Sequence, residues 1–289
     1  MMRKGGIGFF DSGVGGLSVL RACKDVLCGY PVYYYGDNAN APYGNRPIYE
    51  VRAYVREAFD FFARMDALAV VVACNTVTAL LIDELRAAYA FPIVGVEPAV
   101  FPAAKVGKSL LVVATKATAS SLRLKNLVNR VQIAYPNVEI KVFGSEKLAE
   151  LVESGFDGAP SELSRYLPTE NPDCVVLGCT HYSFLSEKIG EYYGAKVFDG
   201  NEAVAKRLAN VLSLRQESRQ KKDFSSDDPP MGCLLRSLPF FVRTSKAKKT
   251  VFRLKKYGVC VKVKNATTLY FVGSGAFKNI QFYKRMFGF

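Results

Sequence analysis

The chain of 289 residues is 49% apolar, enough for a large core or for two domains of ordinary size, and it contains no run of 18 apolar residues that would predict a transmembrane helix. Its formal net charge of +13 comes entirely from the end of the chain: residues 1–214 carry 22 Lys and Arg and 22 Asp and Glu, whereas residues 215–289 carry 17 and 4. The first residues lack a signal-peptide cleavage pattern, so we expect a cytoplasmic protein.

Short apolar runs alternate with helical periodicity over residues 5–214, which predicts stacked βαβ units and mostly parallel sheets of the α/β class. Apolar residues at helical spacing predict helices over residues 49–64, 77–89 and 121–131, and Pro47 is suited to the start of the first. The expected strands cover residues 6–10, 32–36, 69–73, 93–96, 110–114, 138–143, 174–178 and 196–198.

The first expected strand leads into Asp11-Ser12-Gly13-Val14-Gly15-Gly16, which opens a helix. Backbone amides at such a turn can approach an anion closely. The segment matches neither the Walker A sequence nor G-x-G-x-x-G, so it does not predict a triphosphate or dinucleotide site. Asp11 could assist proton transfer at a neighbouring thiol or simply cap the helix, and taken alone it favours the cap.

The second expected strand is followed by a loop that contains Pro42-Tyr43-Gly44. Proline and glycine by themselves indicate only a turn. Ligands of open α/β sheets bind beyond the carboxyl ends of the strands. The position of this loop therefore brings Tyr43 and Gly44 toward the same face as Asp11.

Two cysteine segments each come directly after a strand of the buried type: Cys74-Asn75-Thr76 and Cys179-Thr180-His181. Thiolates are strong bases, and helix N-termini and nearby polar groups favour the thiolate. The neighbouring side chains and backbone N–H groups can hold a carboxylate. A buried cysteine before a helix cap can also be purely structural, but two such segments after equivalent strands favour chemistry applied from two sides.

The only histidine of the chain, His181, lies in the second segment. Imidazole titrates near neutrality, which makes it a natural partner for a thiol that must gain and lose protons. Glu153 could orient this imidazole, although an exposed surface glutamate is the simpler interpretation of the sequence. The remaining five cysteines have no comparable polar neighbours, and no C-x-x-C pair occurs, so no metal site, disulfide framework or thiol-redox motif is predicted.

The two cysteine segments are 105 positions apart, which indicates two halves of similar architecture facing each other across an active-site cleft. We expect residues 1–97 together with 202–289 to form the first α/β domain with a basic C-terminal extension. Residues 98–201 would form the second. Within the extension, residues 215–230 have the composition of a linker, and residues 259–264 could pair as a strand with 269–272.

At these residues the chain resembles the glutamate racemases, which are enzymes of bacterial cell-wall synthesis and belong to the aspartate/glutamate racemase family. The resemblance covers about residues 5–210, in family order, through FDSGVGGLSVL, YYGDNANAPYG, VVACNTVTAL, PIVGVEPA, ATKATASS and VVLGCTHYSFL.

This resemblance implies a cofactor-independent racemase with the two-domain fold and glutamate as substrate. It implies that Cys74 and Cys179 are the two bases and that Asp11, Glu153 and His181 assist them. It also implies a homodimer. The substrate contacts would come from Asp11, Ser12, Tyr43, Gly44, Asn75, Thr76, Thr115, Thr118, Thr180 and His181.

The segment that leads into and includes Glu153, FGSEKLAELVESG, lacks the Cys-Pro usual in the family. The basic tail is longer than is usual in the family. A racemase for aspartate or a related amino acid is the nearest alternative. A nucleic-acid-binding protein that uses the basic tail is an alternative of another class. A solvated basic extension explains the tail more simply, so we expect no nucleic-acid partner and no membrane association.

Overall fold

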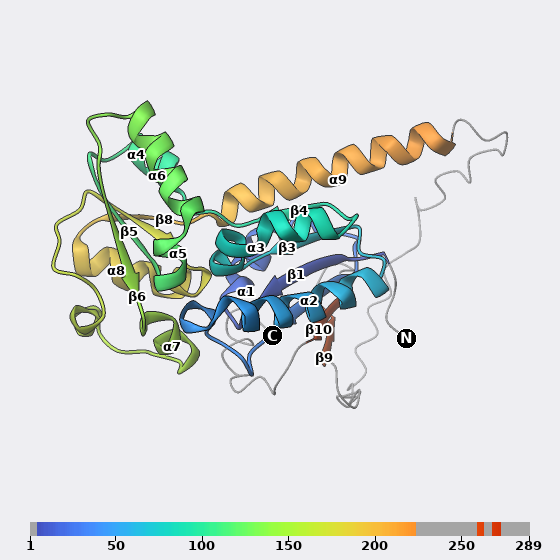
Figure 1. Cartoon of the computed structure of the whole chain (residues 1–289), viewed down its shortest axis with the longest axis horizontal. Helices are drawn as coiled ribbons and strands as arrows, with labels where there is room; N and C mark the ends of the chain where they lie inside the picture. The colour runs from blue at the N-terminus through green and yellow to red at the C-terminus, as the bar shows by residue number, and fades with distance from the viewer. Residues whose placement is uncertain (1–4, 224–258, 263–267, 273–289) are drawn as a thin grey trace, which may run out of the picture.

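The computed structural model describes residues 5–223, 259–262 and 268–272, and within them the chain forms two sheets (Figure 1). The larger sheet has the order β4 (Ile93–Gly95), β3 (Ala69–Val72), β1 (Ile7–Asp11), β2 (Val32–Gly36), β10 (Thr268–Val272) and β9 (Val259–Lys262). The smaller has the order β6 (Glu139–Ser145), β5 (Ser109–Thr115), β7 (Cys174–Gly178) and β8 (Lys196–Phe198). The two-sheet α/β architecture predicted from the sequence is thus confirmed.

The central strands are almost entirely apolar, as is typical of strands that are covered on both faces of a sheet. Strands β1, β3 and β7, with the sequences IGFFD, AVVV and CVVLG, are buried at every residue. Every pairing in the smaller sheet is parallel. In the larger sheet β10 runs parallel to β2, but β9 pairs antiparallel with β10. The predicted pairing of these two C-terminal segments is confirmed. The linker predicted over residues 215–230 is wrong for residues 215–223, which continue helix α9 (Asn201–Asp223), and residues 224–230 lie outside the described residues.

The helices lie close to where their periodicity predicted them. Helix α2 begins directly after Pro47, and α3 begins two residues earlier than expected because Cys74 already caps it. Among the described helices none is both long and apolar enough to cross a membrane. The helices are α1 (Gly16–Ala22), α2 (Ile48–Arg64), α3 (Asn75–Ala88), α4 (Val100–Ala104), α5 (Lys116–Ser120), α6 (Leu122–Ala134), α7 (Leu148–Glu153), α8 (Ser186–Tyr193) and α9 (Asn201–Asp223), and the 3₁₀ turns are η1 (Tyr43–Asn45), η2 (Pro160–Arg165) and η3 (Thr180–Leu185).

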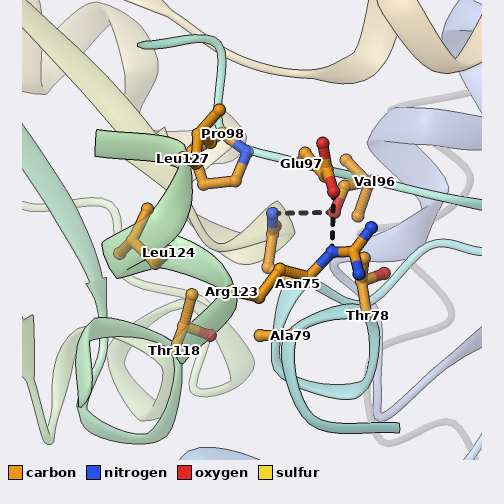
Figure 2. A pocket seen from close by; sticks show the side chains of 10 residues that line it. All are labelled: Asn75, Thr78, Ala79, Val96, Glu97, Pro98, Thr118, Arg123, Leu124 and Leu127. Carbon is orange, nitrogen blue, oxygen red and sulfur yellow. Dashed lines mark hydrogen bonds and ion pairs between the residues drawn. The ribbon is translucent and has the colours of Figure 1, made fainter. Parts of the chain in front are cut away.

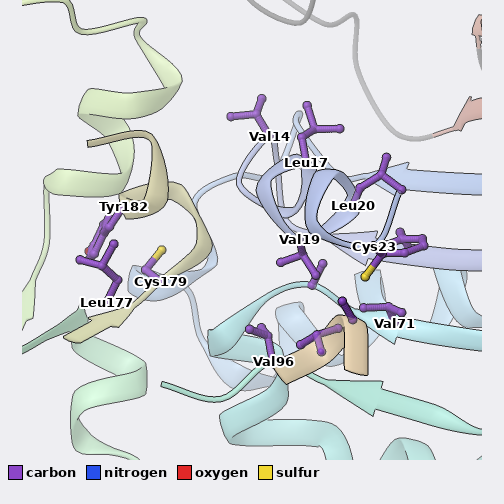
Figure 3. Close-up of a cluster of buried hydrophobic side chains, with 14 of the residues drawn as sticks. Val14, Leu17, Val19, Leu20, Cys23, Val71, Val96, Leu177, Cys179 and Tyr182 are labelled. Carbon is purple, nitrogen blue, oxygen red and sulfur yellow. The ribbon is translucent and has the colours of Figure 1, made fainter. Parts of the chain in front are cut away.

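One hydrophobic cluster extends from the larger sheet into the smaller one. Figure 3 shows its two ends, with Leu17 and Val71 at the first sheet and Leu177 and Tyr182 at the second. Each fully buried side chain of this size stabilises the fold by roughly 1.5–3 kcal/mol. The two halves are therefore held against each other by apolar packing as well as by the chain connections.

The chain crosses between the sheets twice, once after β4 and once after β8. The two crossings touch, because a Cβ atom on Gly200 would lie 2.1 Å from the carbonyl oxygen of Glu97. Helix α9 then packs against α1, β3 and β4 of the larger sheet. The predicted domain boundaries, at residues 97/98 and 201/202, stay a prediction; both crossings lie next to them.

Candidate active site

The two thiols occupy equivalent places in the two sheets. Cys74 follows β3 and caps α3, while Cys179 follows β7 and caps η3, which leads into α8. Both residues have extended backbone angles and are nearly buried, at 4% and 6% exposure. The buried strands thus deliver each sulfur to the carboxyl edge of its own sheet, where ligands of α/β proteins bind.

Cys74 lies in a buried environment with a negative neighbour. Its Sγ is 3.7 Å from Ser12 Oγ. Burial raises the pKa of the Cys74 thiol well above its ordinary value, the charge of Asp11 raises it further, and the Val77 N–H and the Ser12 hydroxyl lower it only in part. The expectation that the helix start would favour a thiolate is therefore wrong for Cys74, because desolvation outweighs the helix N-terminus.

Cys179 has a histidine beside it. Its Sγ lies 3.7 Å from His181 Nδ1, and His181 Nε2 lies 2.7 Å from Glu153 Oε1. Burial lowers the pKa of His181, but the hydrogen bonds to Cys179 and Glu153 outweigh burial and raise this pKa well above its ordinary value. Burial alone would raise the pKa of Glu153, yet His181 and the Val14 N–H hold it below its ordinary value. Glu153 therefore holds an imidazole of raised pKa directly beside the Cys179 sulfur.

Asp11 connects the two thiol-bearing turns. It is fully buried at the end of β1, where its Oδ2 accepts a hydrogen bond of 2.9 Å from Gly13 N and its Oδ1 accepts one of 3.4 Å from Thr180 Oγ1. Burial raises the pKa of Asp11, although the charge of His181 and the N–H groups of Gly13 and Gly16 oppose the rise. Its carboxyl group is thus near both thiol segments.

The glycine-rich loop after β1 packs directly on the Glu153–His181 pair. Val14 N donates a hydrogen bond of 3.0 Å to Glu153 Oε1. A Cβ atom on Gly13 would lie 2.0 Å from that same oxygen, and one on Gly15 would lie 2.3 Å from His181 Nδ1. These glycines therefore allow a close approach between the two halves of the molecule. The cluster of glycines was the only indication of this contact in the sequence.

Three threonine hydroxyls from the two halves meet at one point. Thr76 Oγ1 at the start of α3 lies 3.0 Å from Thr115 Oγ1 and 3.4 Å from Thr118 Oγ1. The neighbouring turn η1 is close as well, since a Cβ atom on Gly44 would lie 2.7 Å from Thr115 Cβ. The hydroxyl cluster joins the first half to the second at the edge of the site.

Tyr43 and Asn75, both predicted to contact substrate, have partners in the fold. The Tyr43 hydroxyl donates a hydrogen bond to the buried carboxylate of Asp37, a partner that sequence reasoning missed although it directly follows β2. Burial and the charge of Asp37 raise the pKa of Tyr43, and the charges of Cys74 and Asp11 raise it further. Asn75 Nδ2 donates to the carbonyl oxygen of Val96 at 3.3 Å.

The structure thus brings every residue predicted for the site into one region. Gly44 and Glu153 are partly buried, and the other predicted residues are buried. Among the described residues, no three His, Cys, Asp or Glu side chains are grouped so that they could hold a metal ion. The predicted residues are Asp11, Ser12, Tyr43, Gly44, Cys74, Asn75, Thr76, Thr115, Thr118, Glu153, Cys179, Thr180 and His181.

Known proteins are similar to this chain in both sequence and fold. The glutamate racemase of Clostridium botulinum (strain Kyoto / Type A2) is 38% identical over 232 residues, which are 75% of this chain and 88% of the relative. The Escherichia coli glutamate racemase, solved with L-glutamate and the activator UDP-MurNAc-Ala, matches with a TM-score of 0.66 and 33% identity over 73% of this chain and 83% of that one.

The glutamate racemase of Campylobacter jejuni matches with a TM-score of 0.64 and 26% identity over 97% of this chain and 96% of that one. A family model described as Asp/Glu/Hydantoin racemase matches residues 16–208. Sequence and fold agree, and this chain belongs to the Asp/Glu/Hydantoin racemase family.

Proposed function

We propose that the protein is a glutamate racemase that interconverts L- and D-glutamate without a cofactor. The observation that carries the proposal is the arrangement of Cys74 and Cys179, which come from different sheets and share Asp11 between them. Inversion of an α-carbon requires a proton to leave from one face and another to arrive at the opposite face, so two acid–base groups suffice. The named relatives support glutamate as the substrate.

The two thiols begin the reaction in different protonation states. His181, held by Glu153 and raised in pKa, can carry a positive charge beside Cys179, whereas burial and the charge of Asp11 raise the pKa of Cys74 and favour its thiol form. The Cys179 thiolate takes the α-proton from the enantiomer whose C–H bond faces it. Cys74 gives its proton to the opposite face, so the reaction leaves Cys179 as a thiol and Cys74 as a thiolate. The enzyme is then in the form that accepts the other enantiomer.

The α-proton is weakly acidic beside an ionised carboxylate, so the charge that grows on this carboxylate must be stabilised. Asn75, Thr76 and Thr180 lie at the two helix starts, where side-chain and backbone donors converge. The closed surroundings exclude water and strengthen these hydrogen bonds. We assign the remaining substrate contacts to Ser12, Tyr43, Gly44, Thr115 and Thr118.

The resemblance of the chain to glutamate racemases extends the proposal to its cellular role. The enzyme would supply D-glutamate for peptidoglycan synthesis in the cytoplasm and act as a homodimer. Sedimentation of the purified protein at several concentrations tests the dimer.

Proton exchange in heavy water tests the proposed reaction. Purified protein incubated in D₂O with either L- or D-glutamate should place deuterium at the α-carbon and form the other enantiomer. Aspartate in a parallel incubation tests the substrate, because its side chain is one methylene shorter and reaches different donors. Exchange and inversion with aspartate but not glutamate would reject glutamate as the substrate. No exchange with either would reject the proposed reaction.

A further inference from the structure

The substrate can reach the thiols only if the cleft opens, because both sulfurs lie on residues that are almost completely buried. Behind the site the two halves meet where α3 packs against α5 and α6. Figure 2 shows this contact, with Ala79 of α3 facing Leu124 and Leu127 of α6. The crevice between them has a volume of about 10 Å³, barely enough for one water molecule. We call this contact of α3 with α5 and α6 the seam, and it must loosen when the two halves separate.

Arg123 joins three elements at the rim of the seam. The residue lies at the start of α6, and its Nε is 2.7 Å from Oε1 of Glu97 in the first crossing between the sheets. Its Nη1 is 3.3 Å from Oδ2 of Asp83 on α3. Oδ1 of Asp83 is also 3.6 Å from Nη1 of Arg86. One guanidinium of the second half thus holds both a helix of the first half and the crossing.

The crossings are in turn hydrogen-bonded to both thiol-bearing turns. The carbonyl oxygen of Val96, next to Glu97, accepts a hydrogen bond from Asn75 Nδ2, as the dashed line in Figure 2 shows. The second crossing contributes Asp199, whose Oδ2 accepts a hydrogen bond of 3.0 Å from Ser183 Oγ in η3. The crossings touch where Gly200 packs against Glu97. A movement at the crossings therefore reaches both sides of the site.

From this geometry we infer that Arg123 is an ionic latch that holds the two halves together behind the thiols and sets how readily the cleft opens. Arg123 is a positioning residue, since its guanidinium binds Glu97 and Asp83 rather than either sulfur. Its carboxylate partners are exposed, at 80% for Asp83 and 43% for Glu97. Exposed ion pairs are individually weak, so the latch changes the frequency of opening rather than the fold.

Alkylation of single cysteines measures this opening directly and does not depend on the substrate. The full-length protein is treated with iodoacetamide, and the modification of each cysteine is followed by peptide mass spectrometry. In Arg123→Gln we expect Cys74 and Cys179 to react about threefold to tenfold faster than in the parent protein, the size that exposed ion pairs allow. Removing a positive charge would slow alkylation by disfavouring thiolates, so faster alkylation cannot be a charge effect.

Two controls separate the latch from general destabilisation. Cys23 is fully buried in the core away from the site, so its alkylation reports unfolding. Arg52→Gln removes a comparable ion pair, with Glu84 at 2.9 Å, that lies within the first half. We expect neither Cys23 in Arg123→Gln nor any buried cysteine in Arg52→Gln to react faster, and Arg123→Lys to give an intermediate rate. Unchanged alkylation of Cys74 and Cys179, or equal acceleration at Cys23, would overturn the latch.

A double-mutant cycle identifies the partners of Arg123. Asp83→Asn combined with Glu97→Gln should expose the two thiols as much as Arg123→Gln does. Adding Arg123→Gln to that pair should give no further acceleration. If the increase in alkylation rate caused by Arg123→Gln multiplies with the increase caused by Asp83→Asn and Glu97→Gln, Arg123 acts through other contacts. That result would overturn the assignment.

Discussion

Cys74 and Cys179 have the same position in the fold and opposite surroundings. Each follows a buried parallel strand and caps the next helical segment. Cys74 has Ser12 and the charge of Asp11 beside it, and its thiol pKa is raised. Cys179 has His181, whose imidazole is held by Glu153. The architecture therefore places two similar groups in equivalent positions, and it is their neighbours that differ.

This difference suits a reaction that must run in both directions. A racemase needs one protonated and one deprotonated group at the start of each turnover, and two identical sites would each carry the same average charge. In the proposed reaction the unequal neighbours favour one protonation pattern of the two thiols, and proton transfer to and from the substrate would reverse that pattern. The predictions below test the comparison by changing one side at a time.

Removing either thiol should have the largest effect. We expect Cys74→Ser and Cys179→Ser each to lower kcat by about 10³-fold, because general acid–base groups contribute about 10²–10⁴-fold and a hydroxyl is a far weaker acid than a thiol. In D₂O, each variant should still exchange the α-proton of only the enantiomer that faces the remaining thiol, and the two variants should differ in which enantiomer this is. Exchange of both enantiomers by either variant would contradict the assignment of one thiol to each face.

A methyl group on Gly15 should disturb only the Cys179 side. The new Cβ atom would lie 2.3 Å from His181 Nδ1, so the imidazole must shift from its observed position beside the sulfur. We expect Gly15→Ala to lower kcat/KM by about 10²-fold in both directions, since an isomerase cannot change its equilibrium constant. Steady-state kinetics with L- and D-glutamate measures this, and thermal unfolding should show that the variant still folds. A variant with normal kcat/KM would mean that His181 does not need its observed position.

Removing the charge of Glu153 should change the pH dependence. The Glu153 carboxylate raises the pKa of His181, so Glu153→Gln lowers that pKa and the imidazolium is lost at a lower pH. We expect the basic limb of the kcat/KM profile to move toward lower pH and the maximal rate to fall by about tenfold. Glu150→Gln, an exposed residue on the same helix, is the matched control and should leave the profile unchanged. An unmoved basic limb in Glu153→Gln would assign that limb to another group.

Replacing a thiol outside the site should have the smallest effect. Cys174 is buried at the start of β7, the strand whose far end precedes Cys179. We expect Cys174→Ala to leave kcat and KM unchanged and to lower the free energy of unfolding by about 1 kcal/mol for the small cavity it creates. Urea denaturation and steady-state kinetics measure the two quantities. A marked loss of activity would show that buried thiols matter here for a reason other than their place at a strand end.

The sequence was most informative where chemistry and secondary structure coincide. Cys74 and Cys179 could be found because a polar segment directly after a buried strand has few structural explanations. The pairing of β9 with β10 was likewise predicted from alternation, although the addition of β10 to the edge of β2 was not. The contacts of Glu153 with Val14 and of Tyr43 with Asp37 had no signal, because each depends on how separate segments are packed together.

The amino-acid sequence alone determined the two-sheet α/β class, the two thiols at the strand ends and the family, since these depend on local patterns and on motifs in a fixed order. The tertiary structure decided the surroundings of each thiol, because burial and the charge of Asp11 raise the pKa of Cys74, whereas His181 and Glu153 come together beside Cys179 from segments far apart in the chain. Electrostatic energies depend on distance and on desolvation, and neither is defined until the two halves of the molecule pack against each other.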